Sequence, residues 1–178
     1  NAVYLKSCRS SRKDSNEKIL TVEEINLLTS TAKARAEKKY YPYYYMVAFS
    51  AQTGVRVGEL CSLKWDDINF DDEEIHIHTQ QLSRVEDGHY IYYEVPYTKN
   101  EKGIPRGGRI FPLTDDIMLL LGELVDAQDK ADAHSEYVFC HEDGRWINTK
   151  EYDSFFRKLC YKCDLRSEER RVGKECRS

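Results

Sequence analysis

Arg56 is the residue whose type and position most clearly suggest chemistry. It lies in the segment TGVRVGELCSLKW, which spans Thr53 to Trp65. Gly54 can take the positive φ that ends a helix, and the leucines that follow recur at the spacing of a short helix over 57–63. A guanidinium at a helix N-terminus, where backbone N–H groups gather, can bind a phosphate or another oxyanion. The local chemistry equally allows a surface ion pair between Arg56 and Glu59, three residues later.

Two helices are predicted before this segment. Thr21 and Glu24 form the pattern of a capping box, so we expect a helix from Val22 to about Ala36. Pro42 suits the first turn of a second helix, which should run through Ala51 and end at Gly54.

The pattern changes to strands after Trp65 and returns to helices later. Alternating residues predict one antiparallel sheet of three strands, over Glu74–Thr79, Tyr90–Val95 and Arg109–Phe111. Further predicted elements are a helix over Thr114–Val125, an extended segment over Tyr137–Cys140 and a last helix that Asn148 caps and that reaches Cys163. Helices, a small sheet and helices again predict an α+β fold.

Several of these segments resemble the catalytic domain of the tyrosine recombinase (phage integrase) family, and integrases of mobile elements in particular. The string TGVRVGELCSLKWDDI is similar to the first arginine motif of the family. The strings LTVEEINLL and VF…DG…F are similar to two further elements, and the resemblance covers Ile19 to Leu165. It implies a mostly helical integrase-like domain with a small three-stranded antiparallel sheet, whose C-terminal part is missing from this chain.

The resemblance also implies an activity. Members of the family are site-specific recombinases that cleave and rejoin double-stranded DNA through a 3′-phosphotyrosine intermediate, with no metal or other cofactor. Arg56 would be the first of two arginines that clamp the phosphate, and Glu59 would support it or only balance its charge. Lys99 would be the general acid, with Lys102 as the alternative. The expected DNA-contacting residues are Arg56, Lys99, Lys102, Arg106 and Arg109.

The nucleophilic tyrosine of the family should follow a His-x-x-Arg motif beyond Leu165, and neither is found. Tyr152 and Tyr161 lie upstream of the position that a nucleophile should occupy. We therefore expect this fragment to be inactive alone, and the full-length parent to assemble as a tetramer on DNA.

The ends of the chain are interpreted separately from this domain. Residues 1–18 are polar and basic, as in a linker from a missing N-terminal DNA-binding domain. Residues 19–165 form the partial catalytic domain. Residues 166–178, RSEERRVGKECRS, match one reading frame of a common short-read sequencing adapter and are interpreted as a non-native tail. Without the tail's five basic and three acidic residues, the formal net charge changes from −4 to −6.

Composition predicts a cytoplasmic protein. Charged residues make up 33% of the chain, and no apolar stretch is long enough to span a membrane. The six cysteines form no regular framework, so we expect reduced thiols. An acidic net charge opposes DNA binding, but the cluster of basic residues between 99 and 109 can outweigh it locally.

Three alternatives remain at this point. Cys160 and Cys163, with Cys140 and His141, could form a zinc-stapled interaction module, although no second C-x-x-C accompanies them. The domain could instead bind DNA without catalysis. A metal-dependent phosphodiester enzyme would need the acidic run 71–74 as its metal site, and we interpret that run as a turn before a strand. His76 and His78 fit a solvated sheet face better than a ligand pair.

Overall fold

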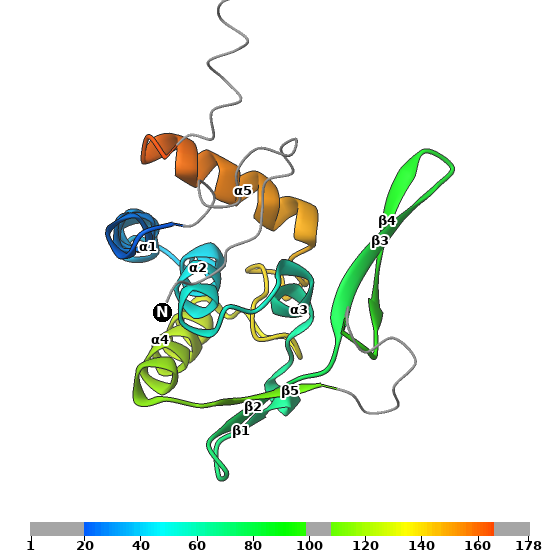
Figure 1. The fold of residues 1–178 in the computed structure, drawn as a ribbon, viewed down its shortest axis with the longest axis horizontal. Coiled ribbons are helices and arrows are strands. Elements are labelled where there is room, and N and C mark those ends of the chain that lie inside the picture. The colour runs from blue at the N-terminus through cyan, green and yellow to red at the C-terminus, as the bar shows by residue number, and fades with distance from the viewer. Residues whose placement is uncertain (1–19, 99–107, 166–178) are drawn as a thin grey trace, which may run out of the picture.

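The computed structural model describes residues 20–98 and 108–165. Its helices are α1 (Val22–Ala36), α2 (Pro42–Thr53), α3 (Val57–Ser62), α4 (Asp115–Ala131) and α5 (Thr149–Lys162). Its strands are β1 (Ile68–Asn69), β2 (Glu74–Ile77), β3 (Gln80–Glu86), β4 (His89–Val95) and β5 (Arg109–Pro112). Figure 1 shows the longer helices α1, α2, α4 and α5 gathered in one body, and the short α3 lies between this body and the β3–β4 hairpin. The predicted α+β class is confirmed.

Caps determine most of the helix boundaries. Thr21 and Glu24 form the predicted capping box of α1, and Asn148 and Glu151 form another at the start of α5. Gly54 ends α2 in the left-handed conformation, at φ 66°, which is the role that the sequence predicted. The helix α4 continues to Ala131, past the predicted end at Val125, because its last turns also pack inward. There the buried Gln128 amide donates to the Val138 carbonyl at 3.0 Å and to the Tyr40 hydroxyl at 3.2 Å.

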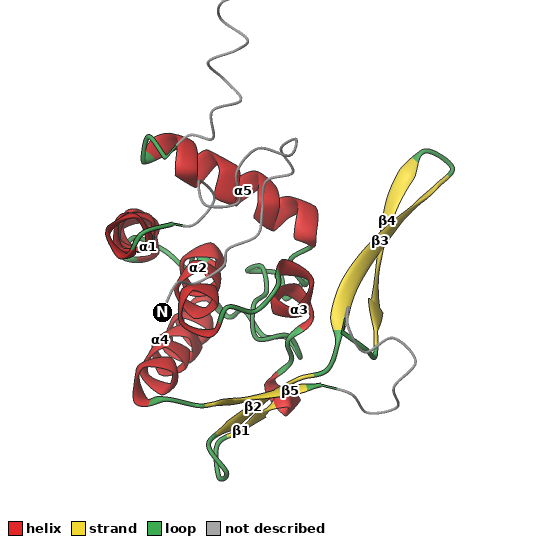
Figure 2. Cartoon of the chain, viewed as in Figure 1, coloured by secondary structure: helices red, strands yellow, loops and turns green. Residues whose placement is uncertain are grey.

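The predicted sheet was wrong in its pairing. The three-stranded antiparallel sheet has the order β1-β2-β5, and β4 pairs with β3 in a separate two-stranded hairpin. Figure 2 shows this hairpin projecting away from the helices. Its turn is Asp87-Gly88, and both residues have positive φ, which gives the tight turn that matches the strand twist. The Asp-Gly pair therefore makes Gln80–Glu86 the partner of β4, and the prediction did not recognise this strand.

An ion-pair network anchors the hairpin to the body. Lys64 Nζ lies 3.4 Å from a carboxylate oxygen of Glu94 on β4 and 3.2 Å from one of Glu136. Partial burial alone would lower the pKa of Lys64, but the hydrogen bond to Glu136 and the charge of Glu94 outweigh burial and raise it. The same ammonium lies 5.2 Å from the ring centre of Tyr137.

The tyrosines around α2 are core residues. Tyr40, Tyr44 and Tyr45 are each at most 7% exposed, and the Tyr40 hydroxyl donates to the Cys140 carbonyl at 2.7 Å. Burial raises the pKa of Tyr45 to about 12, which keeps its phenol neutral at physiological pH. These side chains join a single cluster whose largest fully buried members include Phe49, Phe139, Leu28, Met46, Leu60 and Leu63.

The helix α3 lies close against β3, and a glycine allows this contact. A Cβ at Gly58 would stand 2.8 Å from the backbone carbonyl oxygen of Gln81.

We expect Gly58→Ala to force α3 and β3 apart and to lower the free energy of unfolding by about 1–3 kcal/mol in urea denaturation. Gly122→Ala is the matched control, because this helical site on α4 has nothing within 4 Å. The control should raise stability by about 0.5–1 kcal/mol. Equal effects of the two substitutions would contradict the packing.

Candidate active site

Arg56 occupies the N-cap position of α3, directly after the turn that Gly54 makes. Its backbone N–H donates to Oε2 of Glu59 at 2.9 Å, and its Nη1 donates to Oε1 of the same carboxylate at 3.0 Å. The neighbouring Val55 is 4% exposed, so the backbone here is held by the core. The arginine is therefore fixed at both its main chain and its side chain.

Glu59 is the centre of the site. Its side chain is fully buried. A carboxylate is rarely buried in this way unless cationic groups pair with it. A second arginine, Arg109 on β5, donates from Nη2 to Oε2 of Glu59. One buried carboxylate thus holds two guanidinium groups, which come from positions 53 residues apart in the chain.

The sheet places Arg109 at this carboxylate. Arg109 pairs with Ile77 on β2, and the preceding Gly108 lies so close to β2 that a Cβ would stand 2.7 Å from His76 Nε2. The guanidinium carbon lies 5.2 Å from the ring centre of Phe111. Its Nε is buried without a hydrogen-bond partner among the described residues.

Arg56, Arg109 and Glu59 together carry a net positive charge, and the two arginine side chains are only partly buried. Two guanidinium groups share one carboxylate, and the side chains of Arg56 and Arg109 remain 40% and 36% exposed. Guanidinium N–H groups that face solvent beside a buried counter-ion can bind an oxyanion. The structure therefore contains the ion pair between Arg56 and Glu59 that the sequence allowed. This pair holds Arg56 in place and leaves its side chain partly exposed.

The candidate general acids Lys99 and Lys102, and the DNA-contact candidate Arg106, lie outside the described residues. The residues on either side of their segment, up to Thr98 and from Gly108 onward, are described. The side-chain amide of Gln80 donates to the Tyr97 carbonyl at 2.9 Å, and Gly108 packs on β2 beside His76 and His78. The described residues that precede and follow this segment therefore lie beside β3 and next to Arg109.

The two candidate tyrosines differ in their surroundings. Tyr152 is 2% exposed on α5, and burial raises the pKa of its phenol far above the ordinary value. Its hydroxyl lies 3.5 Å from that of Ser50 in the core. Tyr161 is 51% exposed, near the end of α5. A buried neutral phenol is unsuited to attack a phosphodiester, so the environment of Tyr152 opposes a nucleophilic role.

The structure does not bring together the side chains of the alternative zinc site. Within residues 20–98 and 108–165, no group of three His, Cys, Asp or Glu side chains has the geometry to hold a metal ion. Cys140 is buried beside Tyr40 and Gln128, whereas His141 faces Glu151 at 3.3 Å. His78 pairs with Asp67 at 2.7 Å, and the rings of His76 and His78 lie 4.8 Å apart.

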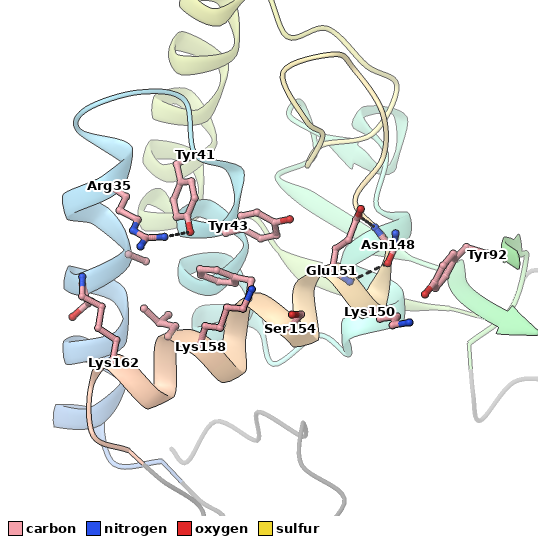
Figure 3. A pocket seen from close by; sticks show the side chains of 14 residues that line it. Arg35, Tyr41, Tyr43, Tyr92, Asn148, Lys150, Glu151, Ser154, Lys158 and Lys162 are labelled. Carbon is pink, nitrogen blue, oxygen red and sulfur yellow. Dashed lines mark hydrogen bonds between the residues drawn. The ribbon is translucent and has the colours of Figure 1, made fainter. Parts of the chain in front are cut away.

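A groove of roughly 580 Å³ lies apart from Arg56, between α1, α5 and the start of α2. Figure 3 shows Arg35, Lys158 and Lys162 along one part of it and Tyr92 of β4 at the other end. Arg35 Nη1 donates to the Tyr41 hydroxyl at 3.1 Å. The sequence patterns did not predict this groove, although Lys158 and Lys162 are four residues apart on one helix face. Its basic residues come from different elements, which only the fold brings together.

The fold agrees with comparisons to known proteins. The model of the phage integrase family matches residues 18–177. This chain belongs to the phage integrase family. It is 26% identical over 157 residues to the transposases from transposon Tn916 of Enterococcus faecalis and from transposon Tn1545 of Streptococcus pneumoniae. Those alignments cover 85% of this chain and 36% of each relative, so the chain spans about a third of their length.

Solved structures of tyrosine recombinases share the fold. The Tn1549 transposon integrase in complex with transposon right end DNA superposes with a TM-score of 0.64 at 21% identity, over 84% of this chain and 46% of that one. The XerA recombinase superposes with a TM-score of 0.56 at 21% identity, over 84% and 44% of the two chains. The predicted family and fold class are confirmed. No helix among the described residues is long and apolar enough to cross a membrane.

Removal of the Glu59 charge tests the site without DNA. We expect Glu59→Gln to lower the free energy of unfolding by about 1.5–3 kcal/mol, because two guanidinium groups lose the charged acceptor that they share. Glu136→Gln is the matched control, since that carboxylate pairs with Lys64 from a side chain that is 66% exposed. The control should change stability by less than about 0.5 kcal/mol. A loss for Glu59→Gln no larger than that of the control would contradict a central role for the buried carboxylate.

Proposed function

We propose that this chain is the arginine- and lysine-bearing part of a tyrosine-type recombinase, which cleaves and rejoins double-stranded DNA. The observation that carries the proposal is the exposed guanidinium of Arg56, held at the start of α3 by the fully buried Glu59. Membership of the phage integrase family supports the same reaction. Arg56 binds the non-bridging oxygens of the scissile phosphate, where negative charge grows in the transition state.

The reaction proceeds through a covalent intermediate. A tyrosine oxygen attacks phosphorus, the bond to the 5′-oxygen breaks, and the 3′-phosphate remains joined to the tyrosine. The departing 5′-oxygen takes a proton from a general acid, for which Lys99 is the first candidate and Lys102 the second. Attack by the freed 5′-hydroxyl on the phosphotyrosine reverses these steps and rejoins the DNA. No metal or organic cofactor takes part in this scheme.

Neither candidate tyrosine of this chain is assigned the role of the nucleophile. The buried, neutral phenol of Tyr152 is unsuited to it, and Tyr161, near the end of α5, lies upstream of the position where the resemblance puts the nucleophile. This chain is thus assigned the first arginine of the phosphate clamp and the proton donor, and we expect no covalent adduct with DNA when the chain acts alone.

The partners of the parent protein follow from the same chemistry. A recombinase must hold two duplexes together, so the parent acts as a tetramer on DNA in the cytoplasm. Solved structures of relatives include the lambda integrase tetramer bound to a Holliday junction. Lys99, Lys102 and Arg106 contact the DNA backbone, which offsets the formal net charge of −4 on the whole chain.

The general acid can be tested in the complete parent protein with a duplex that carries the junction sequence of its own mobile element. We expect Lys99→Ala to slow the formation of the 3′-phosphotyrosyl adduct by roughly 10²- to 10⁴-fold, because the 5′-oxygen departs without a proton. A substrate with sulfur in place of that 5′-oxygen should restore the rate, since a thiolate leaves without protonation.

Lys102→Ala is the matched control on the same segment; it should bind the duplex more weakly, but at saturating duplex it should cleave both substrates at near the wild-type rate. Rescue by sulfur in Lys102→Ala, with no defect in Lys99→Ala, would move the general acid to Lys102. Failure of the unmodified parent to form any adduct would contradict the proposed function itself.

A further inference from the structure

Arg109 was expected to contact DNA, but its side chain lies on a buried carboxylate. We infer that Arg109 is a positioning residue, which acts through Glu59 to hold Arg56 in the orientation that binds the scissile phosphate. This inference rests on the proposed function and adds a role that the arginine motif alone does not contain.

The first argument is the division of one carboxylate between two arginines. Oε1 of Glu59 accepts from Nη1 of Arg56 at 3.0 Å, and Oε2 accepts from Nη2 of Arg109 and from the Arg56 backbone N–H at 2.9 Å. Without Arg109, Oε2 is free to accept a second bond from the Arg56 guanidinium. Such a fork-to-fork pair would turn Arg56 N–H groups away from a phosphate. Arg109 thus keeps the Arg56 guanidinium bonded to Glu59 through Nη1 alone.

The second argument is charge. One buried carboxylate and one arginine would form a neutral pair, which has little attraction for an anion. The second guanidinium gives the cluster a net positive charge, while a third or more of each arginine side chain stays exposed. Arg109 therefore offsets the charge of Glu59, so that the charge of Arg56 remains available to the phosphate in the transition state.

The third argument is how Arg109 is held. Its main chain pairs with Ile77, its guanidinium lies over Phe111, and its Nη2 donates to Glu59. A side chain fixed at these points is suited to set the geometry of a neighbour. Arg109 also follows the segment of Lys99 and Lys102 by only a few residues. Arg109 therefore links the start of β5 to the start of α3, where Arg56 lies.

The test compares cleavage rates in the complete parent protein, at saturating duplex that carries its junction sequence. We expect Arg109→Met to lower the rate of adduct formation roughly 10- to 100-fold, because a misoriented Arg56 stabilises the transition state poorly. DNA affinity and the salt dependence of binding should stay within about twofold of the wild type, since no phosphate contact is lost. In a Glu59→Gln background, Arg109→Met should slow cleavage no further, because its route to Arg56 is already cut.

Arg109→Lys is the second variant, should Arg109→Met fail to fold by circular dichroism. It keeps the charge but not the forked geometry, so it should recover part of the lost rate. Arg157→Met is the matched control for the loss of one positive charge, since this arginine lies exposed on α5, and it should leave cleavage unchanged. Losses that are additive with Glu59→Gln, or a drop in DNA affinity with a smaller salt slope, would make Arg109 a direct DNA contact and overturn the inference. If the unmodified parent does not cleave, the proposed function fails instead.

Discussion

The buried carboxylate of Glu59 is the constraint on which the candidate site depends. A fully buried charge is costly unless cations compensate it, and here the compensation comes from two distant parts of the chain. The start of α3 must therefore lie beside the start of β5. This single requirement fixes the approach of the small sheet to the helical body, and it leaves two guanidinium groups at the surface. The two arginines that compensate the buried charge are thus the same groups that can bind an oxyanion at the surface.

Packing around this contact supports it from both sides. Gly58 allows α3 to lie against β3, and Gly108 allows the start of β5 to lie against His76 of β2 and the following His78. The network of Lys64, Glu94 and Glu136 then holds the β3–β4 hairpin to the body. None of these contacts is made by Arg56 itself; they hold α3, β5 and the hairpin together around it.

Sequence patterns predicted the helices well because caps and breakers act locally. Thr21 with Glu24, Gly54 and Asn148 each marked a boundary that the structure has. The sheet was harder because strand pairing joins distant segments. The Asp87-Gly88 pair carried a strong hairpin signal that would have paired Gln80–Glu86 with β4, and only Gly88 was interpreted, as a break. The link between Glu59 and Arg109 could not be predicted, since nothing local at Arg109 distinguishes a buried ion pair from a DNA contact.

The central claim is that Arg56 and Arg109 share one buried carboxylate, and a cycle of unfolding free energies measures this directly. Arg56→Met or Arg109→Met alone leaves Glu59 with one cation, whereas the double variant leaves a buried charge with none. The account predicts that the double variant loses about 1–3 kcal/mol more than the sum of the single losses in urea denaturation at neutral pH. Additive losses, within about 0.5 kcal/mol, would contradict it.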